Sequence, residues 1–204
     1  MTAQADHHLV FVSKIVKVSS TDCAVELTIS GANQNNFQSD DRIDIGSSGT
    51  QLTPSFIAQI NAAEGENDTG DTLLFASPSF VSAHGISADI EFEGDADCEG
   101  ITSGTTVIFL NSGTIAIDSI DTSTVSGFGD TNTAITKSSH NGTPTLVNLS
   151  SATLQIKNNS GATVTLGTSN TTGGGTTTGS TSTSTSTTTS GASSSSGGCS
   201  LIRS

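Results

Sequence analysis

The chain has 204 residues and a formal net charge of −13 at pH 7, and ten of its 19 acidic residues lie between Glu64 and Glu99, where Lys and Arg are absent. Such a surface repels nucleic acid and anionic membranes, and it favours cations and basic partners. Trp and Tyr, on which carbohydrate and single-stranded nucleic-acid sites usually depend, are missing, and no apolar run approaches the ~18 residues of a membrane span. We therefore expect neither a nucleic-acid partner nor a membrane span.

Composition divides the chain into three segments. Residues 1–8 are an N-terminal arm in which Ala3-Gln4-Ala5 resembles the end of a signal-peptide cleavage site, so the arm is either the remnant of a secreted precursor or the trace of a start codon placed too late. Residues 9–167 carry the apolar patterns of one domain. Residues 168–204 are mainly Ser, Thr and Gly, and such a run buries too little surface to offset its ordering entropy. We expect this tail to be a flexible spacer.

The first apolar segment, residues 9–18, is rich in β-branched residues and predicts a strand. Its first half is apolar on both faces. That pattern fits a strand between two layers, and it also fits a strand that pairs outside its own domain. The candidate residues for donating a strand to a neighbouring chain are Leu9, Val10, Phe11 and Val12.

The rest of the domain predicts more short strands. Residues 22–30 alternate apolar and polar side chains with the period of a strand that has one buried face. Residues 78–85 form a loop or one helical turn, residues 127–142 form an irregular excursion, and no window shows a clear 3.6-residue period. Further strands are expected at residues 42–46, 55–60, 72–76, 88–93, 105–110, 114–120, 146–149, 153–157 and 163–166. About ten short strands separated by Gly, Asn, Asp and Ser turns predict an all-β sandwich.

Three cysteines bear on the compartment and on attachment. Cys23 and Cys98 lie in the domain, and in a secreted protein two such cysteines usually form a disulfide, here closing a loop of about 75 residues and contributing roughly 2–5 kcal/mol. In a cytosolic protein they would be separate thiols. Cys199 is left over in the tail, where a lone cysteine suggests an intermolecular disulfide or a covalent attachment.

Two acidic clusters are candidate calcium sites. Asp95, Asp97 and Glu99 have the spacing that opens a calcium loop, although Thr106 stands where such a loop usually ends in Glu. The second cluster consists of Glu64, Glu66, Asp68 and Asp71. The alternative is a solvated acidic face that protects sheet edges from aggregation.

No catalytic constellation is evident in the sequence. The histidines, at positions 7, 8, 84 and 140, have no ligand spacing, and the chain has neither a G-x-S-x-G elbow nor a phosphate-cradling loop. Glu91 and Glu93 share a strand face, but aromatic residues that would hold a sugar between them are missing. We expect a protein that is not an enzyme and that has no cofactor other than Ca²⁺.

Several short motifs between residues 9 and 129 occur in a familiar order. The opening strand is followed by Val25-Glu26-Leu27, by a loop rich in Asn and Gln around Phe37, and by Leu73-Leu74-Phe75-Ala76 after an acidic loop. Cys98 and a hairpin at residues 105–120 complete the pattern. It resembles the lamin-tail domain, an immunoglobulin-like β-sandwich of nuclear lamins and secreted bacterial proteins, although Ile120-Asp121 stands where the family often has an aromatic residue. The resemblance implies a binding, adhesive or structural module without catalysis.

The end of the chain carries a second resemblance. Residues 197–203, Gly-Gly-Cys-Ser-Leu-Ile-Arg, resemble the start of a Cys-containing C-terminal sorting signal of envelope proteins, without the apolar helix and basic cluster that follow in such signals. We therefore expect a non-catalytic extracellular protein on the cell surface. The favoured form is a subunit of a filament or other surface assembly joined to its own copies by strand addition. The alternatives are contact with another surface protein and a monomeric, tethered adhesion module, stabilised by Ca²⁺.

Overall fold

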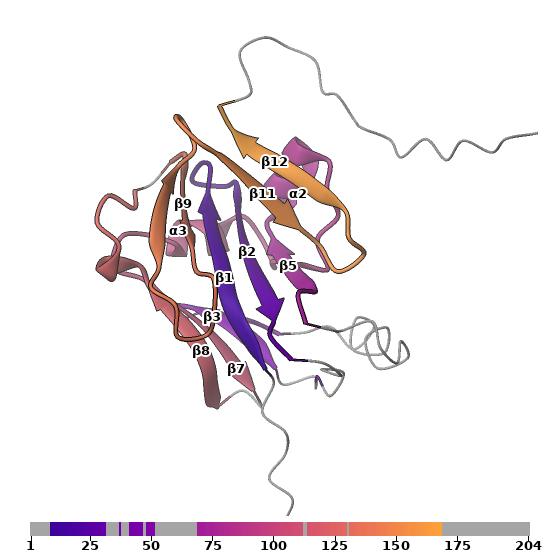
Figure 1. The fold of residues 1–204 in the computed structure, drawn as a ribbon. Helices are drawn as coiled ribbons and strands as arrows, with labels where there is room; N and C mark the ends of the chain where they lie inside the picture. Colours follow the sequence, from indigo (N-terminus) through magenta and orange to yellow (C-terminus); the bar gives the residue numbers. More distant parts are fainter. Residues whose placement is uncertain are drawn as a thin grey trace, which may run out of the picture. The chain divides into compact units, whose positions relative to one another are not determined.

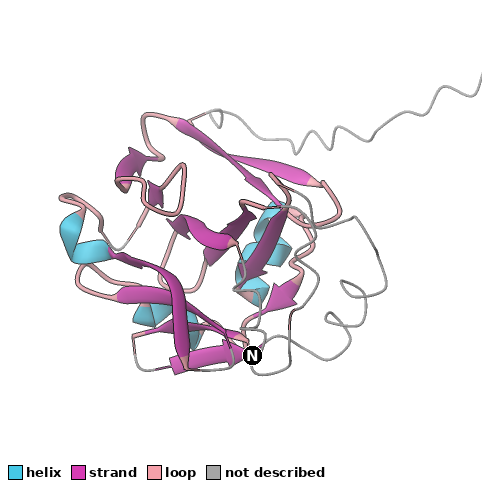
Figure 2. Cartoon of the chain, turned by 60° about the horizontal axis from the view of Figure 1, so that its bottom comes forward, coloured by secondary structure: helices cyan, strands magenta, loops and turns pink. Residues whose placement is uncertain are grey.

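A computed structural model describes residues 9–31, 37, 41–46, 48–51, 69–111, 114–129 and 131–168. The chain divides into two units, residues 1–171 and 172–204, and all the described residues belong to the first. Strands are the main regular structure in these ranges, with only short helices between them (Figure 2). The prediction of a β-rich fold is confirmed, with the addition of helical segments. The strand expected at residues 55–60 lies outside the described residues.

The largest sheet, sheet A, has six strands in the order β10-β9-β1-β2-β5-β6 (Figure 1). Neighbours run antiparallel except β5 and β6, which are parallel. In chain order its strands are β1 (Val10–Lys17), β2 (Cys23–Ile29), β5 (Thr72–Ala76), β6 (Ile90–Glu91), β9 (Thr133–Thr136) and β10 (Thr145–Asn148). The central strand β1 pairs with β2 along almost its whole length but with β9 only from Lys14 to Lys17. One side of the first half of β1 therefore has no strand partner among the described residues.

Two smaller antiparallel sheets complete the described fold. Sheet B has the order β4-β3-β7-β8 and is formed by β3 (Arg42–Ile45), β4 (Ser48–Gln51), β7 (Thr106–Asn111) and β8 (Ile115–Asp121). A register shift interrupts the pairing of β7 with β8 after Phe109. The third sheet is a hairpin of β11 (Thr153–Lys157) and β12 (Thr163–Gly167), as the sequence predicts.

The central strands of sheet A are buried on both faces. One face shares a core with sheet B, and this core includes Val12, Val25 and Leu27 of sheet A together with Ile43 and Phe109 of sheet B. The opposite face is covered by α2 and by the β11–β12 hairpin; the buried side chains there are Val16, Ala24, Leu74, Ala76, Phe80, Ile86, Ala134, Leu149, Ile156 and Leu166. In β1, Ile15 and Val16 lie in the two different cores, and Phe11 near its start is also buried, so the strand is apolar on both faces. Each fully buried large apolar side chain stabilises the fold by roughly 1.5–3 kcal/mol.

Local features of the sequence explain where the first helix begins and ends. Helix α2 (Pro78–His84) begins after Ser77, whose hydroxyl oxygen accepts the Phe80 N–H, and ends at Gly85 with a φ of 65°. A Ser-Pro start and a left-handed glycine end are both favourable, so the helical alternative for residues 78–85 is confirmed. Helix α3 (Ala96–Gly100) and the 3₁₀ helix η1 (Thr122–Thr124) follow.

Strand β9 corrects one expectation. Residues 127–142 were expected to be irregular, but Thr133–Thr136 forms a strand next to β1. Its sequence, Thr-Ala-Ile-Thr, has no alternation because Ala134 and Ile135 are both buried, one on each face of the sheet. A four-residue strand buried on both faces leaves no periodic signal.

Candidate functional site

The predicted disulfide between Cys23 and Cys98 is present. It joins the start of β2 to α3 across 75 residues of sequence, with 5.5 Å between the two Cα atoms. Both cysteines are fully buried in the core between the two larger sheets. Beside it, Lys17 donates to the backbone oxygens of Cys98 (2.8 Å) and Ile101 (2.5 Å). The short helix α3 is therefore tied to sheet A by a covalent bond and by a buried ammonium group.

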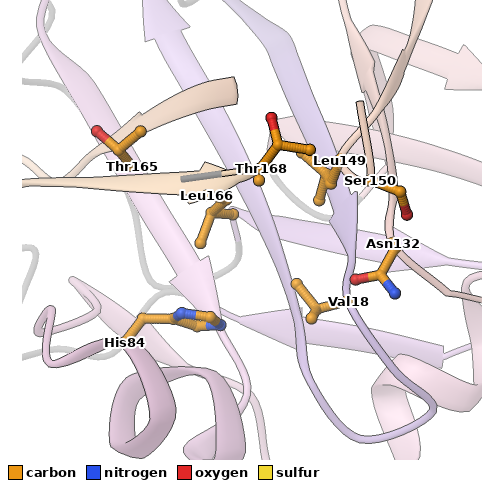
Figure 3. Close-up of a pocket in the computed structure, with 9 residues that line it drawn as sticks. Val18, His84, Asn132, Leu149, Ser150, Thr165, Leu166 and Thr168 are labelled. Carbon is orange, nitrogen blue, oxygen red and sulfur yellow. The ribbon is translucent and has the colours of Figure 1, made fainter. Parts of the chain in front are cut away.

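A cavity of about 410 Å³ opens where the β11–β12 hairpin meets the end of α2; we call it the hairpin pocket (Figure 3). Its lining combines hydroxyl, amide, imidazole and aliphatic groups from Val18, His84, Asn132, Leu149, Ser150, Thr165, Leu166, Gly167 and Thr168. Asn132 has a φ of 51°, a left-handed conformation that Asn tolerates better than most residues. The volume is in the range of small-ligand sites.

His84 is the titratable residue in this lining, and contacts with Asp22 and Phe80 fix the position of its ring. Its Nε2 lies 3.1 Å from Asp22 Oδ2, and its ring packs at a tilt against that of Phe80, one helical turn earlier, with 4.5 Å between the ring centres. The other carboxylate oxygen, Asp22 Oδ1, is buried without a hydrogen-bond partner among the described residues. Asp22 thus orients the imidazole at one side of the pocket.

This pair does not amount to a catalytic triad in the described structure. Figure 3 shows Ser150 and Asn132 on the side of the pocket opposite His84. The backbone N–H of Ser150 donates to Asn148 Oδ1, and no described hydrogen bond links Ser150 to His84. A nucleophile would need to lie within hydrogen-bond reach of its base. The chemistry that the hairpin pocket offers is recognition of a small polar group, with His84 as donor or acceptor.

A second cavity, about 350 Å³, lies between the start of β1 and β8; we call it the β1–β8 groove. It is lined by Leu9, Val10, Ser30, Ile115, Ala116, Ile117 and His140. Leu9 is 54% exposed and Ile115 is 45% exposed, and the remaining large exposed hydrophobic residue of the described chain, Leu146, lies on β10 at 37%. Ile115 and Leu146 thus lie on β8 and β10, which are the outermost strands of sheets B and A.

The four residues expected to donate a strand lie beside this groove. Val10, Phe11 and Val12 belong to β1 and are buried, and the Leu9 carbonyl accepts the Ser30 backbone N–H. The segment therefore pairs within its own chain, and its donation to a neighbour stays a prediction. On the side where β9 is absent, the Val12 N–H donates to Asp118 Oδ2 at 2.8 Å. A carboxylate there takes the place that a strand carbonyl would occupy.

Asp118 is the centre of a buried polar cluster that the sequence analysis missed. Lys137 Nζ lies 2.5 Å from Asp118 Oδ2, and both side chains are almost fully buried. His140 Nδ1 lies 3.2 Å from the other oxygen, Oδ1. The parity along β8 was ambiguous, because Asp118 has the same parity as the buried Ile120, whereas the apolar residues Ile115 and Ile117 have the opposite parity. The burial of Lys137 could not be predicted from the sequence, because the residues next to it are polar.

The predicted calcium ligands that the structure describes do not form a metal site. Asp95 precedes α3 and accepts hydrogen bonds from the Ser79 hydroxyl (2.8 Å) and N–H (3.3 Å). Asp97 and Glu99 lie on α3, and partial burial, followed by the charge of Glu93, raises the pKa of Asp97. Across the described ranges, no group of three or more His, Cys, Asp or Glu side chains is arranged to hold a metal.

The remaining candidate residues are placed as follows. Asp71 precedes β5, and its backbone oxygen accepts the Ile29 N–H. Glu64, Glu66, Asp68 and Cys199 lie outside the described residues, so their roles stay predictions. Helices in the described ranges are all too short or too polar to cross a membrane.

Comparison with family models, with curated proteins and with solved structures finds no match to this chain.

Proposed function

We propose that this protein is a non-catalytic extracellular structural subunit, an immunoglobulin-like β-sandwich that joins copies of itself through the open edges of its sheets. The observation that carries the proposal is the position of the exposed apolar side chains. Ile115 lies on the edge strand β8, Leu146 lies on the edge strand β10, and Leu9 immediately precedes β1. Exposed apolar residues on strand edges favour pairing with another chain, since edge N–H and C=O groups are then satisfied as well.

The packing supports the β-sandwich part of this proposal. Sheets A and B share one core, and in Phe37 and Phe109 two rings of that core lie 6.2 Å apart. Two packed sheets around one core are what the resemblance to the lamin-tail domain implies, and here their strands are antiparallel except for the pair β5 and β6. That family assignment stays a prediction.

The extracellular location is proposed from the buried disulfide. A buried disulfide is typical of proteins that mature in an oxidising environment, which supports secretion or display on a cell surface. In this proposal residues 168–204 are the spacer, and Cys199 is the attachment or cross-linking residue. The acidic charge of −13 keeps copies soluble until their edges meet.

A second function is favoured by the hairpin pocket. Its volume of about 410 Å³ and its mixed polar and aliphatic lining suit a monomeric surface-tethered binding or adhesion module. Titration with Ca²⁺ tests whether such a module is metal-stabilised, through a rise in melting temperature.

The deciding experiment compares edge variants by light scattering coupled to size-exclusion chromatography and by negative-stain electron microscopy. We expect the full chain to form higher-order species at high concentration. We expect Ile115→Lys and Leu146→Lys to reduce these species, because a charged edge side chain would be buried at the junction. Ser82→Lys, on the exposed part of α2, is the matched control and should leave assembly unchanged. All variants should retain the melting temperature of the wild type within a few degrees.

Two results would refute strand-edge assembly. One is a wild-type chain that stays monomeric at every concentration, which would leave the binding module as the better function. The other is assembly that disappears with reductant or in Cys199→Ser, because the copies would then be joined by a tail disulfide and not by their edges.

A further inference from the structure

The Asp118–Lys137 contact is unusual for a lysine because both partners are withdrawn from water. The side chains of Lys137 and Asp118 are only 3% and 6% exposed. Lys137 Nζ lies 2.5 Å from Asp118 Oδ2 and 3.2 Å from the backbone oxygen of Ser119. Lysine is almost never fully buried in a protein unless its charge has a partner.

Three groups from two other segments of the chain meet at the Asp118 carboxylate. Asp118 comes from β8, Lys137 follows β9 directly, and His140 lies three residues further along. The backbone N–H of Val12 in β1 donates to Oδ2 at 2.8 Å, and His140 Nδ1 lies 3.2 Å from Oδ1. The two carboxylate oxygens therefore have different environments. Oδ2 is held in the core, and Oδ1 faces a half-exposed imidazole.

The surroundings disfavour separated charges. Val12 is fully buried, and Asp118 pairs in register with Phe109, which is also fully buried. Taking an ammonium and a carboxylate out of water is costly, and the low dielectric of the core repays that cost only in part. Proton transfer from Nζ to the carboxylate turns the ion pair into a neutral amine beside a neutral acid. The amine then stands next to the carboxyl carbon, in the arrangement that speeds an intramolecular reaction.

We infer that Lys137 and Asp118 condense spontaneously into an intramolecular amide, an isopeptide cross-link between the two side chains. The bond from Lys137 Nζ to Asp118 Cγ forms, and the bond from Cγ to Oδ1 breaks. Of the three protons on the ammonium, one stays on the amide nitrogen and two leave with Oδ1 as water. No electrons are gained or lost, so the reaction needs no oxidant, reductant or activated co-reactant.

Each neighbour has a defined part in this step. The Val12 N–H stays on Oδ2, which carries negative charge in the tetrahedral intermediate and becomes the amide oxygen. His140 relays a proton to Oδ1 and so makes that oxygen the leaving group. His140 also lines the β1–β8 groove, through which the released water reaches solvent.

The cross-link would join the two larger sheets. Asp118 belongs to sheet B, and Lys137 directly follows β9 of sheet A. The Lys137 N–H donates to the Ser13 carbonyl of β1, so Lys137 is itself attached to sheet A. The disulfide, in contrast, ties sheet A to α3. Sheets joined by a covalent bond cannot slide apart without breaking it, which is a useful property in any chain that transmits force at a surface.

The test is intact-mass spectrometry of the purified full chain, reduced and unfolded before measurement. We expect a mass lower than the sequence mass by one water molecule, and a protease digest that yields one branched peptide joining residues 118 and 137. Lys137→Arg should show its full sequence mass. Lys14→Arg is the matched control, because Lys14 also lies 2.5 Å from a buried carboxylate, that of Glu26, but is itself 23% exposed. This variant should keep the mass deficit.

Three outcomes would overturn the inference, none of which depends on a variant that must fold. The first is a folded wild-type chain with its full sequence mass, which would make the contact an ion pair only. The second is a deficit that persists in Lys137→Arg. The third is a branched peptide that maps to other residues. His140→Gln tests the proton relay separately: a larger fraction of unreacted chains at a fixed time after expression is expected, and an unchanged fraction would remove His140 from the step.

Discussion

Asp89 shows how one carboxyl group couples pH to the packing of the outer hairpin. Its Oδ2 accepts the Leu74 N–H of β5 at 2.7 Å and the Asn159 N–H in the β11–β12 turn at 2.9 Å. Burial raises the pKa of Asp89 from 3.8 to about 6, and the two backbone hydrogen bonds oppose this rise only in part. The folded chain therefore binds the Asp89 proton more tightly than the unfolded chain does.

This pKa shift predicts that the protein loses stability as the pH rises from about 4 to about 6. Between the two pKa values the folded state binds more protons than the unfolded state, so the free energy of unfolding falls with pH and then levels off. At about 1.4 kcal/mol per pKa unit, reduced for partial exposure of the side chain, the loss is roughly 2 kcal/mol. Asp89→Asn should remove this slope while keeping an oxygen for both N–H groups. Urea unfolding at several pH values measures it.

The control for this experiment is an exposed carboxyl with the opposite shift. Hydrogen bonds from the Ser123 hydroxyl and N–H lower the pKa of Asp121, so its stabilisation is present at neutral pH and is lost as the pH falls. Asp121→Asn should therefore leave the decline between pH 4 and 6 in place. An Asp89→Asn variant that retains the wild-type decline would show that another group causes it.

The roles of some side chains can be predicted from the sequence, and the roles of others cannot. Cys23 and Cys98 were paired from the sequence, since few alternatives exist for two cysteines in one secreted domain. The Asp118–Lys137 contact was not found, because it depends on where β8 and the segment after β9 meet in space. Likewise, His84 contacts Asp22, 62 residues earlier in the chain, only in the folded structure.

Helix α2 depends on one hydroxyl group more than its length suggests. Ser77 Oγ accepts the Phe80 N–H (3.1 Å) and the Cys23 N–H (3.3 Å), and it donates to the Thr21 carbonyl (2.8 Å). Ser77 therefore caps the helix and also fastens it to the start of β2. It is fully buried, so water cannot replace these bonds easily.

Ser77→Ala should lower the free energy of unfolding by about 3 kcal/mol, more than the ~1 kcal/mol of an average N-cap, because the Cys23 N–H and the Thr21 carbonyl lose their partner as well. Denaturant unfolding measures the change. Ser82→Ala, at an exposed position of the same helix, should change stability by less than about 0.5 kcal/mol. Equal effects of the two substitutions would contradict the special role of Ser77.

Strands were easier to predict where only one face is buried. In β2 the apolar residues Val25, Leu27 and Ile29 alternate with Glu26 and Thr28, and this alternation is visible in the sequence. In β8 the pattern is broken, because Asp118 is buried while Ile115 is exposed. Strand β9 is buried on both faces and has four residues, so its sequence resembles a loop. Strand β6 was expected at residues 88–93 but has only two residues. On either side of it, the N–H groups of Asp89 and Phe92 donate to carbonyl oxygens of β5.

The disulfide is expected to stabilise the entire described domain. Replacing both cysteines, as Cys23→Ser with Cys98→Ser, should lower the free energy of unfolding by about 2–5 kcal/mol, because the unfolded chain is no longer constrained by the loop between them. Thermal unfolding checks this as a drop in melting temperature of several degrees. Cys199→Ser is the control and should leave the melting temperature unchanged. A double variant as stable as the wild type would mean that native-state strain cancels the effect of the cross-link.

The sequence by itself determined the β-rich class, most strand positions, the disulfide pair and the border near residue 168, because these follow from local alternation, turn residues and composition. Tertiary structure alone decided the two-sided burial of the central strands of sheet A, the short helix α3, the two cavities and the cluster at Asp118. These features arise where segments distant in sequence meet, and no local pattern records which segments those are. In β-rich folds most stabilising contacts are of this long-range kind.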